Sequence, residues 1–122
     1  MASPLRRGGT IFFKVNSQQF RAKGNFSYVI SVPKREAVVG ADAVHGFTEK
    51  PQVPYIEGEI TDGSDVDIQA FFNLTDATVT LELANGKVIV LRNAWYAGDA
   101  KGQTEEGNIS ARFEGMSGEE VR

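Results

Sequence analysis

The 122-residue sequence has no cysteine and a single histidine, and these two shortages exclude several kinds of site. Without cysteine there is no disulfide framework, no thiol nucleophile and no cysteine-ligated zinc site. One histidine excludes metal clusters and active sites that need several imidazoles. No apolar run approaches the roughly 18 residues of a membrane-spanning helix, so no membrane insertion is expected. The N-terminal residues MASPLRRGG lack the apolar segment of a signal peptide, which favours a soluble protein made in a cytosol.

The composition is that of one folded domain, with 41% apolar and 24% charged residues. A chain of this length supports one hydrophobic core, and no linker or internal repeat divides it, so residues 1–122 are expected to form a single domain. The net charge of −3 is unevenly spread. Residues 1–35 carry seven of the 13 bases and no acid, whereas residues 36–122 carry the other six bases and all 16 acids.

Two interpretations of this charge distribution stay open. The folded chain could have one basic and one acidic surface, so that identical copies attract head to tail. It could equally be an ordinary domain whose solvated charges are unevenly placed. In either case the overall acidity argues against general binding of nucleic acids, for which a net basic surface is expected.

Alternation of apolar and polar residues, which is typical of half-buried strands, dominates the sequence. It predicts about seven strands near residues 11–15, 19–23, 26–32, 55–61, 77–83, 87–96 and 108–114. One short helix is predicted at residues 65–73, with Ser64 as its N-cap and Phe71 and Phe72 on its apolar side. Asn85-Gly86 predicts a type I′ turn between two of the strands. The predicted fold is therefore mainly β, a sandwich or barrel with one flanking helix.

Two segments lack a clear period. Residues 33–53 contain scattered prolines, glycines and apolar residues, so we expect a long loop there, either flexible or ordered against a partner. Its apolar residues favour the partner, and the candidate contact residues between subunits are Val38, Val39, Val44 and Phe47. Residues 116–122 are expected to form a polar C-terminal tail.

No motif for catalysis or cofactor binding is present. His45 stands alone in the expected loop, and Glu57 and Glu59 would lie side by side on one strand face instead of flanking a bond. Residues 62–67 resemble a calcium loop only faintly, and a helix cap explains them better. Trp95 and Tyr96 could form a platform for a sugar, although such a pair is more often one core ring and one edge ring. We therefore expect no enzyme activity, cofactor or metal.

Several short motifs carry a family resemblance: LANGK at residues 83–87, VLRNAW at 90–95, GNISARFEG at 107–115 and RGGT at 7–10. With these motifs the sequence resembles the tail tube proteins of Mu-like contractile-tailed bacteriophages. The resemblance spans most of the chain; it is strongest from about residue 77 to 115 and weakest across residues 33–53. The motifs are structural, so they identify a family and not a reaction.

The resemblance implies a fold related to the tubes of type VI secretion. Six subunits would form a ring, and rings would stack into a hollow tube inside a contractile sheath, through which the genome passes on ejection. A baseplate initiator and a tape-measure protein would determine where the tube starts and how long it grows. The protein would belong to the virion tail and be assembled in the cytoplasm of the host bacterium.

A channel for DNA should present acidic or neutral polar groups, because cationic groups bind phosphates. Candidate lumen-facing residues on polar strand faces are Glu57, Glu59, Thr78, Thr80 and Glu82, although each could instead face solvent or the sheath. Other functions stay open. The chain could be the tube subunit of a phage-like secretion or injection machine, or a carbohydrate-binding β-sandwich that uses Trp95 and Tyr96; a small hydrolase has the weakest support.

Overall fold

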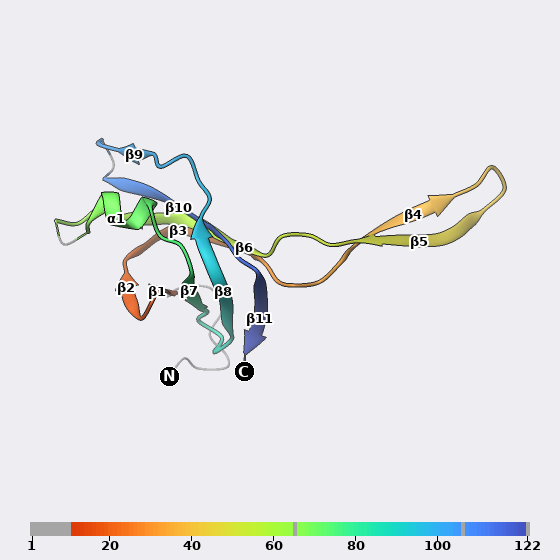
Figure 1. Cartoon of the computed structure of the whole chain (residues 1–122), viewed down its shortest axis with the longest axis horizontal. Coiled ribbons are helices and arrows are strands. Elements are labelled where there is room, and N and C mark those ends of the chain that lie inside the picture. Colours follow the sequence, from red (N-terminus) through yellow and green to blue (C-terminus); the bar gives the residue numbers. More distant parts are fainter. Residues whose placement is uncertain (1–10, 65, 106, 122) are drawn as a thin grey trace.

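A curled antiparallel sheet forms the main part of the molecule in the computed structural model, which describes residues 11–64, 66–105 and 107–121 (Figure 1). Seven strands pair in the order β2-β1-β7-β8-β10-β6-β3, while β11 adds to β8 and β9 adds to β10. Their bounds are β1 Phe12–Val15, β2 Gln18–Phe20, β3 Ala22–Val29, β6 Tyr55–Thr61, β7 Ala77–Glu82, β8 Val88–Tyr96, β9 Gly102–Gln103, β10 Asn108–Glu114 and β11 Ser117–Val121. The prediction of a mainly β fold is confirmed.

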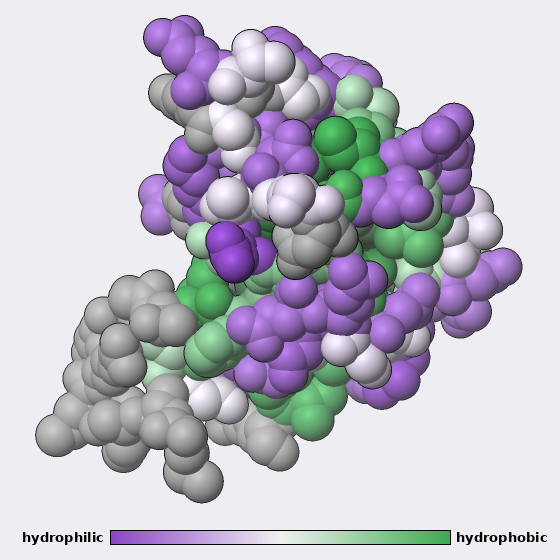
Figure 2. Space-filling view, turned by 90° about the vertical axis from the view of Figure 1, so that its left-hand side faces the viewer, coloured by the Kyte–Doolittle hydropathy of each residue, from purple (hydrophilic) through white to green (hydrophobic). Residues whose placement is uncertain are grey.

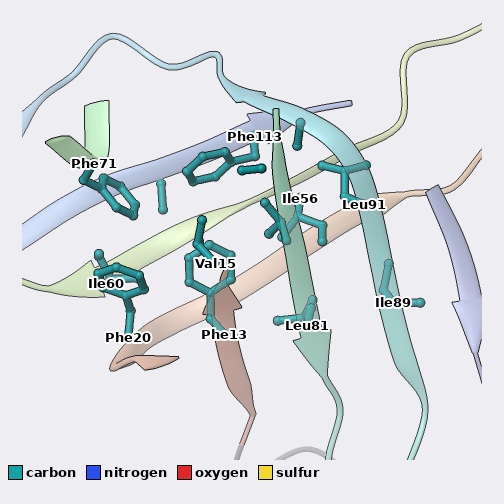
Figure 3. Close-up of a cluster of buried hydrophobic side chains, with 14 of the residues drawn as sticks. Phe13, Val15, Phe20, Ile56, Ile60, Phe71, Leu81, Ile89, Leu91 and Phe113 are labelled. Carbon is teal, nitrogen blue, oxygen red and sulfur yellow. The ribbon is translucent and has the colours of Figure 1, made fainter. Parts of the chain in front are cut away.

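One side of the curled sheet encloses the core. Ile56 and Ile60 of β6, Leu81 of β7, Leu91 of β8 and Phe113 of β10 are all fully buried, and Figure 3 shows their side chains pointing into one common space. Because side chains alternate along a strand, the residues between them face outward. The alternation predicted for β6, β7 and β10 is therefore confirmed. On β8, Val88 and Val90 remain half-buried, so the outward side of this strand is not fully covered.

The helix α1 (Ile68–Phe72) closes one end of the core, but its N-cap differs from the predicted one. Asp67, and not Ser64, caps it, because the Asp67 Oδ1 atom accepts a hydrogen bond from the Ala70 N–H at 3.2 Å. Phe71 is 3% exposed and its ring packs edge-on against Phe113 with centroids 5.4 Å apart. The predicted helical segment also includes Asp65, which lies outside the described residues.

The backbone geometry predicted for Asn85-Gly86, with two successive residues at positive φ, occurs at another turn instead. Asn16 and Ser17 have φ values of 50° and 70° and join β1 to β2 by a two-residue turn, in which both residues need positive φ. At the predicted type I′ turn, Gly86 has positive φ (91°) but Asn85 does not. There Gly86 N donates to the Leu83 carbonyl at 3.0 Å, and Leu83 N donates to the Lys87 carbonyl at 2.8 Å. Three residues separate Leu83 from Lys87, and this longer turn closes with only Gly86 at positive φ.

The expected long loop at residues 33–53 is wrong, because this segment contains a β-hairpin. Strands β4 (Lys34–Val39) and β5 (Val44–Lys50) pair antiparallel and project from the sheet, as Figure 1 shows. Every residue of both strands is exposed. A register shift after Val38 places an extra residue in β5, and this bulge breaks the period that would have revealed the strand. We call residues 34–50 the arm and the rest of the described chain the body.

The expected polar tail at residues 116–122 is also wrong over its described part. Residues 117–121 form β11, which pairs with β8 in the register Gly118↔Leu91. Gly118 allows close packing, since a Cβ atom there would lie 2.9 Å from the Cβ of Pro54. The Glu119 carboxylate accepts a hydrogen bond from Arg92 at 2.7 Å, so the polar composition conceals an edge strand. The RGGT motif at residues 7–10 lies outside the described residues.

Polar side chains cover most of the body surface that faces away from the arm, with apolar atoms showing between them (Figure 2). Within the described part of the chain, no helix is long and apolar enough to cross a membrane.

Candidate functional site

The outward surface of β6 and its neighbours is the first candidate site, and we call it the β6 face. Tyr55, Glu57 and Glu59 point outward from β6, because they alternate with the buried side chains of Ile56 and Ile60. The strand register places Arg112 of β10 directly opposite Glu57. The neighbouring strands add further polar side chains to this surface, among them Lys23, Asn25 and Ser27 of β3 and Ser110 and Glu114 of β10.

Arg112 is the centre of the contacts on the β6 face. Its Nη1 atom donates to the Glu57 carboxylate at 2.7 Å, and its Nε and Nη2 atoms donate to Glu114 Oε2 at 3.3 and 3.0 Å. The guanidinium carbon lies 4.2 Å from the centre of the Tyr55 ring, within the range of a cation–π contact. All three nitrogen atoms of the guanidinium therefore donate to a carboxylate.

The two carboxylates also change the acidity of Arg112. Partial burial lowers its pKa, but the hydrogen bonds to Glu57 and Glu114 outweigh this effect, and the pKa is raised above its ordinary value. Arg112 therefore stays charged at any pH at which the protein would be handled. Glu59 is held separately, because its Oε2 atom accepts a hydrogen bond from the side-chain amide of Asn108 at 2.7 Å.

The β6 face is only mildly acidic. The three carboxylates of Glu57, Glu59 and Glu114 stand against the two cations of Lys23 and Arg112, which leaves a net charge of −1 on these side chains. Sequence analysis identified Glu57 and Glu59 but missed the role of Arg112 and Glu114. Their outward direction follows from alternation in β10; their place beside Glu57 depends on the pairing of β10 with β6, which no local pattern indicates.

The second polar surface, which we call the β7 face, contains the other candidate lumen residues. Thr78, Thr80 and Glu82 point outward from β7, and the Glu82 carboxylate accepts a hydrogen bond from the Lys14 amine at 3.1 Å. The Asn16 side-chain oxygen accepts a hydrogen bond from the Thr78 N–H at 2.9 Å. This surface is neutral. β8 and β10 separate β7 from β6 in the strand order, and the sheet curls between them, so the structure does not bring the two candidate sets together.

The arm has one apolar and one polar side. Its register pairs Ala37 with Phe47 and Val39 with Val44, which places these four side chains on one side. The Arg35–Glu49 pair lies on the same side at the base of the arm, where the Arg35 guanidinium carbon is 4.9 Å from the centre of the Phe47 ring. The opposite side carries Lys34, Glu36, Thr48 and Lys50, and Lys50 lies 3.8 Å from Glu36. Three of the four candidate contact residues therefore share a side, whereas Val38 lies on the polar side, opposite Gly46. Phe47 and Val44 are 57% and 69% exposed.

Bases and acids are interleaved on the described surface. Lys14 pairs with Glu82, and Arg35 donates to Glu49 at 2.9 Å. These bases belong to the N-terminal third of the chain and their partners to the remainder, so the described residues do not divide into one basic and one acidic surface. Arg6 and Arg7, which contribute to the basic segment, lie outside the described residues.

The structure gives no support to a sugar platform at Trp95 and Tyr96. These neighbours on β8 point to opposite sides of the sheet. The Tyr96 ring packs edge-on against Phe113 with centroids 5.5 Å apart, and its hydroxyl donates to the Ser110 carbonyl at 2.7 Å. Burial raises the pKa of Tyr96, even though its hydrogen bonds oppose this effect. Tyr96 is thus the core ring of the pair.

His45 and the acidic segment near residue 64 also have structural roles in this fold. His45 Nε2 lies 3.0 Å from Asp42 Oδ1 in the exposed turn of the arm, not in a cleft. Asp67 is occupied as the N-cap of α1. Among the side chains that the structure describes, no three His, Asp or Glu residues are grouped so that they could hold a metal ion.

Comparison with known proteins gives these surfaces a context. A family model described as "Phage tail tube protein" matches residues 5–120. The chain belongs to the phage tail tube protein family. It is 29% identical over 105 residues to the tail tube protein of Escherichia phage Mu, which covers 86% of each chain. It is 28% identical over 103 residues to the Mu-like prophage FluMu tail tube protein of Haemophilus influenzae, covering 84% of this chain and 80% of the relative.

Membership of the tail tube family confirms the resemblance carried by the motifs at residues 83–87, 90–95 and 107–115. It implies a structural role in the virion tail and assembly with itself and with other tail components. The exposed apolar side of the arm and the two outward polar faces are therefore the surfaces of a protein that works as part of a larger assembly.

Proposed function

We propose that this chain is the subunit of the hollow inner tube of a contractile phage tail, in which six copies form a ring, rings stack into a tube, and the tube conducts DNA into the host. The observation that carries the proposal is the match of residues 5–120 to the tail tube family. The relatives named above come from a phage and from a prophage, which favours a phage tail over a secretion machine.

In this proposal the arm joins one copy to another. A two-stranded hairpin alone is at best marginally stable in water. The arm nevertheless leaves Val39, Val44 and Phe47 exposed on one side. A neighbouring copy that covers this side removes apolar surface from water, at about 25 cal/mol per Å² buried. A heterologous contact of this kind closes into rings or continues as a stack, which is the geometry of a tube.

The β6 face lines the channel in this proposal. DNA phosphates bind exposed cations by releasing counterions, so a channel wall should offer none that are free to pair with phosphate. On the β6 face, two of the three carboxylates bind Arg112 and the face retains a net negative charge. The β7 face, with Thr78, Thr80 and Glu82, would then face a neighbouring subunit or the sheath. DNA passes through without specific binding.

The remaining partners follow from the family resemblance. A sheath protein would surround the tube, a baseplate initiator would start it, and a tape-measure protein would determine its length. Assembly would take place in the cytoplasm of the host bacterium, and the finished tube would belong to the virion tail.

The test is electron microscopy and light scattering of the purified chain over a range of concentration and salt. We expect rings or tubes for the wild type and for Lys50→Ser on the polar side of the arm. We expect none for Phe47→Ser on the apolar side, although its body should stay folded. Wild-type protein that remains monomeric under every condition would contradict the proposed tube, and equal assembly of both variants would contradict the role of the arm.

A further inference from the structure

A cation on the wall of a DNA channel is a hazard, and Arg112 is one of the two on the β6 face. Guanidinium groups bind phosphate in a two-pronged geometry and are the most effective phosphate ligands among side chains. An Arg that was free on each of six copies would give every ring six sites for DNA. The contacts of Arg112 indicate how the fold avoids this outcome.

We propose that Glu57, Glu114 and Tyr55 act as a clamp that withholds Arg112 from DNA phosphate. The inference rests on the proposed placement of the β6 face at the lumen. In this arrangement Arg112 joins β10 to β6 through Glu57, but it is not available to bind DNA.

The geometry of the clamp leaves little for a phosphate to use. Nε, Nη1 and Nη2 of Arg112 each donate to a carboxylate, and one side of the guanidinium plane is covered by the Tyr55 ring. These bonds use three of the five guanidinium N–H groups, so a phosphate that binds the Nε–Nη2 edge would have to displace Glu114. It would also approach a cluster in which two negative charges surround one positive charge, so the local field repels it.

The position of these residues on paired strands makes the clamp rigid. Arg112 lies opposite Glu57, and Glu114 lies opposite Tyr55, in a continuous antiparallel register. The Arg112 side chain is 30% exposed, compared with 63% for Arg35 in the arm. A lysine could not replace it, because a single ammonium group lacks the planar fork that reaches two carboxylates while lying on a ring.

The β7 face provides a contrast within the same body. There, within the described part of the chain, Lys14 pairs with the single carboxylate of Glu82 at 3.1 Å, so one negative charge faces one positive charge. A phosphate could exchange for Glu82 without approaching a second carboxylate. The two-to-one ratio at Arg112 is therefore the feature that distinguishes a clamp from an ordinary surface ion pair.

The test measures DNA retention by the purified full-length chain, with a linear double-stranded DNA fragment as the probe, in a mobility-shift assay at about 50 and 200 mM NaCl. We expect no retention for the wild type. Glu57→Gln with Glu114→Gln should raise DNA affinity at least tenfold at the lower salt, and the increase should vanish at the higher salt. Adding Arg112→Gln should abolish the retention. Asp76→Asn with Glu105→Gln is the matched control, since it changes the net charge equally but alters neither carboxylate that binds Arg112.

Retention that survives Arg112→Gln, or that appears equally in the control, would overturn the clamp, because it would follow net charge alone. An unchanged affinity in the folded double variant would overturn it as well. If the double variant does not fold, Glu57→Gln alone removes one of the two negative charges that Arg112 binds, and the same comparison of DNA affinity decides.

The placement of the face has a separate readout. The chain has no cysteine, so Glu59→Cys can be labelled uniquely with a gold cluster and located in micrographs of tubes. Label on the tube axis is expected. Label at the outer edge would overturn the assignment of the β6 face to the lumen. The DNA-retention assay would still test whether Glu57 and Glu114 keep Arg112 from binding DNA.

Discussion

The body and the arm are both antiparallel β-structures, and they differ in whether the apolar side of their strands is buried. Both consist of antiparallel strands with one apolar and one polar side. In the body, the curled sheet turns its apolar sides toward one another and toward α1, so Phe13, Leu81 and Phe113 are fully buried. In the arm, neither strand has a buried residue. The body thus completes its core within one chain, whereas the described residues leave the apolar side of the arm exposed, except where Arg35 lies over the Phe47 ring at 4.9 Å.

Their charged contacts differ in the same way. The Arg35–Glu49 pair of the arm spans 2.9 Å, but both side chains are largely exposed. Exposed pairs of this kind contribute at most about 1 kcal/mol. In the body, Arg112 combines two carboxylates with an aromatic ring and is less exposed. Arg35 also lies over a ring, that of Phe47, but it binds one carboxylate and is more exposed than Arg112. The comparison therefore predicts that the same substitution has different consequences in the two regions.

The largest expected difference is between Phe113→Ala and Phe47→Ala. Phe113 is fully buried among the rings of Phe13, Phe71 and Tyr96, so its truncation should leave a cavity and lower the free energy of unfolding by about 3–5 kcal/mol. Phe47 is 57% exposed, and its truncation should change the same quantity by less than about 0.5 kcal/mol. Urea unfolding followed by the fluorescence of Trp95, the one tryptophan, measures both.

The comparison between body and arm would fail if Phe47→Ala destabilised the isolated chain as much as Phe113→Ala. That result would mean that the apolar side of the arm packs on its own body in solution. A small effect of Phe113→Ala would instead mean that the ring cluster is loosely packed.

The body could be predicted from the sequence largely because its strands follow a strict period. Tyr55–Thr61 and Asn108–Glu114 alternate without interruption, so alternation alone assigned the correct residues to the core. The arm could not be predicted, because the bulge near His45 interrupts the period and prolines flank the segment. β11 was missed since two of its five residues are glutamates, and their partners Arg92 and Lys87 belong to a distant segment.

The candidate surfaces were predicted only in part, and for a related reason. Alternation correctly placed Glu57, Glu59, Thr80 and Glu82 on outward faces. It could not indicate that Arg112 lies opposite Glu57, because that contact depends on which strands are neighbours. The order of strands is a property of the whole fold, and no local pattern encodes it. Whether the β6 face lines a channel remains a prediction.

The second comparison concerns Gly58 and Gly46, because a side chain at Gly58 would clash whereas Gly46 has a positive φ. A Cβ atom at Gly58 in the body would lie 2.6 Å from the ring of Phe26, so Gly58→Ala should force this ring to move and cost about 1–3 kcal/mol. Gly46 in the arm has open space around it but a φ of 126°, so Gly46→Ala strains only the backbone of the hairpin. Trp95 fluorescence in urea should therefore report a loss for Gly58→Ala and nearly none for Gly46→Ala.

Gly46→Ala should instead reduce assembly, since the arm must keep its shape to contact a second copy. Light scattering measures this effect. A body destabilised by Gly46→Ala would contradict the separation of the two regions, because strain in the arm would then reach the core.

The smallest expected effect concerns α1, a part of the body in which Phe71 is the one buried residue. Asp67→Ala removes the side-chain acceptor of the Ala70 N–H and should lower the free energy of unfolding by about 1 kcal/mol. The loss should reach the body because Phe71 anchors the helix among the core rings at centroid distances of 5.1 Å to Phe20 and 5.4 Å to Phe113. Ser64→Ala is the matched control, and it should change little because Asp67 already caps the helix. Equal losses would mean that both side chains share the cap, while no loss in either would mean that α1, like the arm, folds independently of the core.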